Sequence, residues 1–409
     1  MRQTTIIALL FMLLAATASA ADYKDVASGV RYTHIGDYNV ERLNKILTSE
    51  VAAFSNFKMQ YPEAANGVSL YKVLYTTMIP EQGNRPTLAS GLVAVPQTTQ
   101  KKLPVVSYQH GTVFTRTAVP SRPEESDETR IVTARLAGNG YVVIGADYIG
   151  KGDSTEPDSY MVRESTVQAC MDMLFAARAV LADLGIEENG LYLSGWSQGS
   201  WSTQQFRHRL ESLNMPAKAA ATAATPADLY LLLTRWINNP SSLDATWLAG
   251  SVILFTYSYA YYYDMPGLPQ TIIRPEYQAV CRDFYENKIG WEELQPQIPA
   301  KVADLVQEEV MAQSSAGMDS FFRRLRDNQA FMWRSATPCR YYYGKVDEVM
   351  PPYVSTLAVG YTITAGEPGL RPCMLATPPT TGVRFCMGWG IRRIFLTASV
   401  KPFLCPLAV

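Results

Sequence analysis

Residues 191–199 read Leu-Tyr-Leu-Ser-Gly-Trp-Ser-Gln-Gly, an apolar run followed by the pattern G-x-S-x-G. The apolar run predicts a buried strand, and Gln198 opens a helix. Gly195 and Gly199 are needed because the serine would lie in a tight strand-to-helix turn, where flanking side chains would clash. The turn would lift the hydroxyl of Ser197 above the sheet, at a helix N-terminus whose N–H groups favour negative charge. This context favours a nucleophile over a purely structural turn.

The remainder of the chain alternates short β-rich runs with helical stretches, which is typical of a mostly parallel sheet covered on both faces. Between two of these runs, residues 164–184 carry apolar side chains at helical spacing, and Gly185 ends the helix. The pattern predicts an α/β fold with about eight strands. Strands are expected at residues 71–79, 88–95, 103–108, 141–146, 191–194, 217–224 and 340–343.

The strand pattern stops at about Thr225 and resumes near Arg340. The segment between is helical and aromatic, so we expect an inserted helical cap at residues 225–330. Within it, residues 245–263 carry no charge. A transmembrane helix is one interpretation of this run, but its many tyrosines and serines favour a buried cap helix.

A second motif, Gln109-His110-Gly111-Thr112, follows the expected strand at 103–108. In this type of sheet the loop after that strand donates one N–H group to the oxyanion, and the residue after the nucleophile donates the other. Thr112 and Gln198 are therefore the expected oxyanion donors. His110 is a conceivable general base, but its place on this loop favours a structural role.

The acid is expected after the strand at 340–343, where the chain reads Gly344-Lys345-Val346-Asp347-Glu348. A carboxylate in a turn past a late strand, following the serine in chain order, can orient and charge-stabilise a histidine. We assign this role to Asp347, with Glu348 as the neighbouring alternative. A solvated turn carboxylate is the other interpretation.

These motifs resemble those of the α/β-hydrolase superfamily, and more narrowly its secreted lipase and esterase branch with an inserted cap. The resemblance implies hydrolysis of carboxylic esters through an acyl-enzyme, without a metal or organic cofactor, but it does not identify the substrate. A secreted peptidase or acyltransferase on the same fold and a non-catalytic binding protein are the alternatives. The resemblance covers roughly residues 65–360 and rests on His110 to Thr112, Asp147, Tyr148, Gly150, Gly152, Asp153, the turn at Ser197, and Gly344 to Asp347.

The same resemblance requires a histidine some tens of residues after Asp347. The chain has only His34, His110 and His208, all of which lie upstream. His208 falls in the helix after Ser197, where a packing or surface role is expected. Because a serine hydroxyl without a base is a poor nucleophile at neutral pH, the chain as written is expected to be inactive or weakly active.

The tail at residues 366–409 has an unusual composition, with no acidic residue after Glu367 and half of the cysteines of the chain. Back-translating residues 378–383 in a shifted frame permits Ala-Asp-His-Arg-Gly, which resembles the segment around the catalytic histidine of the superfamily. We hypothesise a single-base insertion or deletion near residues 361–366, with the lost histidine encoded across the codons of Thr380 and Thr381. The last strand and helix are then expected to be disordered or mispacked. The alternative is a natural variant tail on a non-catalytic protein.

The N-terminus combines Arg2, an apolar run at 5–16 and the small-residue sequence Ala18-Ser19-Ala20. This pattern predicts a signal peptide at residues 1–20, and hence a secreted or periplasmic protein. A membrane anchor is the less favoured interpretation, because the apolar run is shorter than the roughly 20 residues that span a bilayer.

Composition limits the other function classes. The formal net charge of −1 creates no field for nucleic acid or anionic lipid. The six cysteines show no zinc or redox spacing, so no metal site is expected. The expected partner is a small-molecule or lipid ester, and no membrane segment is expected in the mature chain. With 409 residues, the chain is expected to divide into a signal peptide (1–20), a first core part (21–224), the cap (225–330), a second core part (331–365) and the altered tail (366–409).

Overall fold

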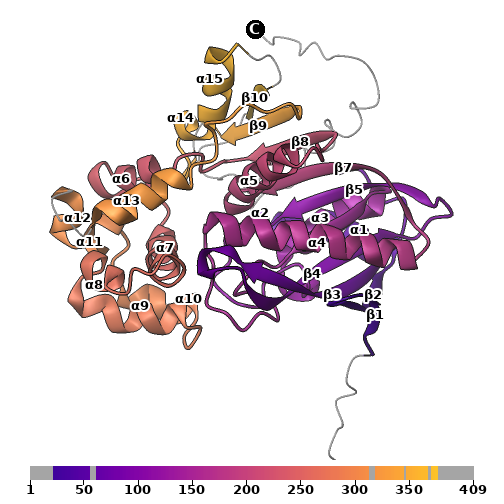
Figure 1. Ribbon diagram of the computed structural model, residues 1–409, viewed down its shortest axis with the longest axis horizontal. Helices are drawn as coiled ribbons and strands as arrows, with labels where there is room; N and C mark the ends of the chain where they lie inside the picture. The colour runs from indigo at the N-terminus through magenta and orange to yellow at the C-terminus, as the bar shows by residue number, and fades with distance from the viewer. Residues whose placement is uncertain (1–21, 56–60, 313–317, 345–346, 367–369, 376–409) are drawn as a thin grey trace, which may run out of the picture.

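The computed structural model describes residues 22–55, 61–312, 318–344, 347–366 and 370–375. Within these residues ten strands form one sheet in the order β1-β2-β3-β4-β6-β5-β7-β8-β9-β10 (Figure 1). The first four strands pair antiparallel, and β4 also pairs antiparallel with β6. The other six strands run parallel to one another. Their bounds are β1 Lys24–Ala27, β2 Val30–Tyr38, β3 Val68–Ile79, β4 Arg85–Pro96, β5 Lys102–Gln109, β6 Val142–Ala146, β7 Glu187–Trp196, β8 Ala219–Ala223, β9 Cys339–Gly344 and β10 Leu370–Leu375.

The parallel part of the sheet is covered on both faces. Val105 belongs to a buried cluster that includes Leu174 and Leu210, from the helices α4 (Arg163–Asp183) and α5 (Gln198–Ser212). The next residue, Val106, belongs to the opposite cluster with Val132 of α3 (Asp127–Leu136). Successive strand residues point to opposite faces, so the apolar runs read from the sequence supply both layers of the core.

A group of helices lies between β8 and β9 and is gathered on one side of the molecule (Figure 1). The uncharged run at 245–263 contains α7 (Leu248–Tyr262), whose side chains are mostly buried. Among the described residues, no helix has the length and apolar content needed to cross a membrane. The group consists of α6 Leu229–Asn238, α7, α8 Leu268–Ile272, α9 Gln278–Tyr285, α10 Trp291–Leu294, α11 Val302–Leu305, α12 Glu308–Ala312 and α13 Met318–Asp327.

Short helices also precede β3 and follow β9. Before β3 lie α1 (Val40–Lys45), the π-helical turn η1 (Ile46–Glu50) and α2 (Val51–Ser55), and after β9 lie α14 (Pro352–Ser355) and α15 (Leu357–Thr364). Short 3₁₀ turns occupy Pro80–Gln82, Pro123–Glu125, Ala137–Asn139, Pro275–Tyr277 and Gln295–Gln297.

Each expected strand coincides with an observed one, and the helix expected at 164–184 is α4. The expected number of about eight strands was too low, because β1 and β2 were not foreseen, and the last strand, β10, was expected in the tail without bounds. In β2 a register shift between His34 and Gly36 breaks the alternation that marks a half-buried strand. The domain limits given above stay predictions.

The expectation of a disordered last strand is wrong for residues 370–375, and the expectation of mispacking stays a prediction. These residues form β10, which pairs in regular parallel register with β9, Leu370 opposite Cys339 and Leu375 opposite Gly344. The signal peptide at 1–20 and most of the tail, including Thr380 and Thr381, lie outside the described residues.

Candidate active site

Ser197 lies alone between the end of β7 and the start of α5. Its backbone has φ 55° and ψ −122°, a conformation that is costly for a residue with a side chain. The Ser197 N–H donates to the carbonyl of Ala223 at 3.0 Å, and its carbonyl accepts from the N–H groups of Ser200 at 2.9 Å and Trp201 at 3.2 Å. The strained turn is therefore held by β8 on one side and by the first turn of α5 on the other.

The two glycines of the G-x-S-x-G pattern are sterically required. A Cβ atom on Gly195 would lie 2.2 Å from the carbonyl oxygen of Gly199. A Cβ atom on Gly199 would lie 1.9 Å from the carbonyl oxygen of Gln109, at the end of β5. Both contacts involve backbone atoms that cannot rotate away, so the clash expected from the sequence is present at both positions.

Three of the four predicted site residues line one cavity. Ser197, Thr112 and Asp347 lie on the wall of a cavity of about 230 Å³. Gln198 is buried and lines an adjoining crevice of about 10 Å³ that also contains Ser197 and Thr112. The remaining cavity wall is formed by Phe114, Trp196, Ala224, Trp247, Trp291, Glu348, Val349 and Met350.

Hydrogen bonds to Glu128 and Tyr160 hold the loop after β5 in place. The N–H of Gly111 donates to the buried carboxylate of Glu128 at 2.9 Å, and the hydroxyls of Thr112 and Tyr160 are 2.9 Å apart. Gln198 opens α5, a position whose N–H has no acceptor within its own helix. The arrangement is suited to two N–H donors at an oxyanion. The supporting residues Glu128 and Tyr160 were not identified from the sequence, because their contacts join segments far apart in the chain.

Asp347 is a structured carboxylate. Its Oδ1 accepts the N–H groups of Val349 at 2.9 Å and Met350 at 2.8 Å, so the solvated-turn interpretation does not describe it. Its Oδ2 is buried and, within the part of the chain that the structure describes, accepts no hydrogen bond. Burial raises the pKa of this carboxyl to about 7. A cationic donor at Oδ2 would favour the ionised form and reverse that shift.

None of the three histidines lines the cavity. His110 is buried, stacks on Tyr148 at 4.3 Å between ring centres, and has its Nδ1 2.8 Å from the carbonyl of Gly111. Burial lowers the pKa of His110 to about 4, so it is neutral at physiological pH. His208 stacks on Trp333, and His34 lies on β2, 3.2 Å from Asp37. The structural role expected for His110 agrees with these contacts.

No family model matches the chain, and no curated protein matches it either. Solved structures do match. A protein of Legionella pneumophila, provisionally named a hydrolase, is 21% identical, with a TM-score of 0.79 over 91% of this chain and 99% of that one. The rice cell wall degrading esterase LipA from Xanthomonas oryzae is 20% identical, with a TM-score of 0.72 over 90% of this chain and 94% of that one. Candida antarctica lipase A is 14% identical, with a TM-score of 0.59 over 84% and 76%.

The chain has the α/β-hydrolase fold.

In this α/β-hydrolase fold the residues at 147–153 stabilise the structure around the site. Buried Asp147 accepts a hydrogen bond from the hydroxyl of Ser90 at 2.5 Å and another from the N–H of Ser121 at 2.8 Å. A Cβ atom on Gly152 would lie 2.1 Å from the Asp147 carboxylate. Lys151 forms a buried ion pair with Asp158 at 2.9 Å. These contacts tie neighbouring loops together, outside the wall of the Ser197 cavity.

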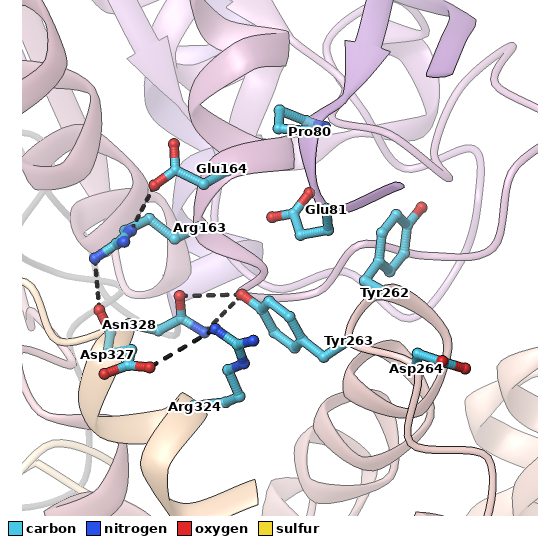
Figure 2. A pocket seen from close by; sticks show the side chains of 10 residues that line it. All are labelled: Pro80, Glu81, Arg163, Glu164, Tyr262, Tyr263, Asp264, Arg324, Asp327 and Asn328. Carbon is cyan, nitrogen blue, oxygen red and sulfur yellow. Dashed lines mark hydrogen bonds and ion pairs between the residues drawn. The ribbon is translucent and has the colours of Figure 1, made fainter. Parts of the chain in front are cut away.

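A second, larger hollow of about 410 Å³ lies where the helices between β8 and β9 meet α4 and the Pro80–Gln82 turn (Figure 2). Its polar groups largely satisfy one another. Arg163 donates to the carbonyl of Asp327 at 2.6 Å, and the side-chain amide of Asn328 is hydrogen-bonded to the Tyr263 hydroxyl. None of the predicted site residues lines this hollow, so it is separate from the candidate active site although it is the larger of the two.

The described residues contain no group of three or more His, Cys, Asp or Glu side chains that could hold a metal ion.

Proposed function

We propose that the protein is a secreted serine hydrolase of carboxylic esters that acts through an acyl-enzyme on Ser197. The observation that carries the proposal is the shared cavity, in which a strained serine, the oxyanion loop and a buried carboxylate meet. The names of two structural neighbours, an esterase and a lipase, agree with this reaction class. The sequence of residues 1–20 supports export.

In the proposed reaction the Ser197 Oγ attacks the ester carbonyl while a histidine takes its proton. The N–H groups of Thr112 and Gln198 hold the oxyanion. The tetrahedral intermediate collapses, the ester C–O bond breaks, and the histidine passes the proton to the leaving alcohol. Water then releases the acid by the same steps, with Asp347 orienting the histidine throughout.

The histidine of this scheme is assigned to the tail in its restored reading frame. The three histidines present lie away from the cavity, so the chain as written lacks the base. Loss of one triad member typically lowers kcat by about 10⁴-fold or more. The same observation favours a second candidate function, a non-catalytic protein that binds esters in this cavity.

The two candidates are separated by resequencing the gene and labelling with a fluorophosphonate probe. A nearby insertion or deletion in the DNA is expected, and protein made from the restored frame should label rapidly on Ser197, with hydrolysis of p-nitrophenyl esters. The chain as written should label slowly, and Ser197→Ala in the restored protein provides the control. An intact frame together with no labelling of either protein would support the binding function.

Faster cleavage of amides than of esters by the restored protein would favour the peptidase alternative. Transfer of the acyl group to an added acceptor faster than to water would favour the acyltransferase alternative.

A further inference from the structure

The cavity at Ser197 has an aromatic wall built from the loop after β5 and from the helices between β8 and β9. Phe114, from the loop after β5, stacks on Trp291 with ring centres 4.9 Å apart and planes 29° apart. Two further rings contact Phe114 edge-on, Trp247 with ring centres 6.4 Å apart and Phe284 with ring centres 5.6 Å apart. These offset and edge-on contacts are the geometries that aromatic rings prefer, so the wall is a packed surface.

Gly250 of α7 makes room for this wall. A Cβ atom at this position would lie 2.8 Å from the Trp291 ring and 2.9 Å from the Phe114 ring. The pair of stacked rings therefore rests directly on the backbone of α7, and its position depends on the glycine.

The size of the cavity selects a compact ligand. A cavity of about 150 Å³ accommodates benzene, whereas sites for drug-sized ligands begin at about 300 Å³. The cavity at Ser197 has a volume of about 230 Å³. It therefore holds one aromatic ring together with an ester group, whereas a long alkyl chain would extend beyond it.

The adjoining crevice does not extend this space. Its volume is about 10 Å³, at the lower limit for a single water molecule. Tyr160 closes it: the Tyr160 N–H donates to the hydroxyl of Ser258 in α7 at 3.1 Å, and its ring packs edge-on against Phe255 at 5.1 Å. A long chain that entered this crevice from Ser197 would have to displace these groups.

The charges on the wall select against anions. Among the residues that the structure describes, the ionisable side chains that line the cavity are Asp347 and Glu348, and no described lysine or arginine lines it. A carboxylate on the ligand would be repelled by Glu348, and also by Asp347 above about pH 7 where that carboxyl ionises, because charge interactions in a partly buried site are stronger than in water.

We propose that this cavity binds esters of compact, uncharged aryl carboxylic acids and excludes long-chain fatty acyl esters. This inference rests on the proposed ester-hydrolase function and specifies its substrate class. The stacked rings of Phe114 and Trp291 supply the complementary surface, the Tyr160 closure excludes long chains, and the two carboxylates exclude anionic acids.

The test measures binding in the Ser197→Ala protein, which holds an ester without cleaving it. Methyl benzoate, methyl decanoate and monomethyl terephthalate are titrated, with tryptophan fluorescence and calorimetry as readouts. Methyl benzoate is expected to bind at least about tenfold more tightly than either of the others, a difference of about 1.4 kcal/mol. Equal or tighter binding of methyl decanoate would overturn the inference, as would equal binding of the terephthalate monoester.

Two variants in the same background locate the preference. Trp291→Ala enlarges the cavity and should weaken methyl benzoate binding at least about fivefold, while Trp333→Ala, which removes an indole that stacks on His208 outside the cavity, should leave it unchanged. Gly250→Ala, which displaces the wall by one methyl group, should weaken binding in the same direction. Equal effects of the Trp291 and Trp333 variants would contradict the assignment.

The proposed function and the substrate class can be contradicted separately. Aryl ester binding without probe labelling of the restored protein would contradict the proposed function alone. Labelling and turnover with no preference for methyl benzoate would contradict the substrate class alone.

Discussion

The turn at Ser197 and the turn at Asp347 lie on the same cavity but differ in how completely their polar groups are paired. At Ser197, the backbone N–H and carbonyl both have close partners in β8 and α5. At Asp347, one carboxylate oxygen accepts two N–H groups, while the other is buried and has no partner within the described residues. Segments that precede the tail complete the first turn, whereas the second offers an acceptor for the histidine that we assign to the tail.

The largest expected effect comes from breaking the completed turn. Gly199→Ala places a methyl group 1.9 Å from the Gln109 carbonyl oxygen, so β5 and α5 must separate. We expect a loss of more than about 3 kcal/mol in the free energy of unfolding, measured by denaturant titration.

The matched control is Gly360→Ala in α15, where an added Cβ meets no atom of the described residues within 4 Å. Replacing a helical glycine of this kind by alanine should raise the free energy of unfolding by about 0.5–1 kcal/mol. Similar stability changes in the two variants would contradict the steric account of the turn.

An intermediate effect is expected at the incomplete turn. Burial raises the pKa of Asp347 from its ordinary value of 3.8 to about 7, so the folded protein favours the protonated carboxyl. The stability that this provides is complete below about pH 4 and is lost as the pH rises through 7. In the chain as written, Asp347→Asn should be more stable than the parent by about 2 kcal/mol at pH 8, and this gap should close towards pH 4.

Thermal unfolding at several pH values measures that gap. A variant that is less stable than the parent at pH 8 would show that the carboxylate already has a favourable partner, and would remove the contrast between the two turns.

The smallest effect concerns the strain at Ser197. A φ of 55° costs a residue with a side chain about 1 kcal/mol or more, but it costs glycine little. Ser197→Gly should therefore be about 1 kcal/mol more stable than Ser197→Ala, since both variants remove the hydroxyl. Denaturant unfolding of the two proteins side by side checks this, and equal stabilities would indicate a relaxed turn.

Local sequence patterns predicted much of this molecule. The apolar runs marked β3 to β9, and the spacing of glycines around Ser197 predicted a turn whose clashes the structure reproduces. Ser197, Thr112 and Asp347 were selected from motifs and line one cavity. These features succeed because each depends on residues close together in the chain.

Features that depend on distant contacts were not predicted. β2 was missed because its bulge interrupts the alternation, and the composition of the tail gave no bounds for the last strand, β10. Glu128 reaches Gly111 from α3, and Tyr160 meets Ser258 of α7, so neither role has a local signature. The aromatic wall pairs Phe114 with Trp291, two residues that are far apart in the chain and come together only when it folds.

Trapping the acyl-enzyme tests the central claim most directly. Protein from the restored reading frame is mixed with methyl benzoate or p-nitrophenyl acetate, quenched in acid within milliseconds to seconds, digested and analysed by mass spectrometry. We expect the mass of one acyl group on the peptide that contains Ser197, and none in the Ser197→Ala protein. Ester turnover with the acyl group on a different residue, or with no adduct at Ser197 under any quench time, would contradict the account.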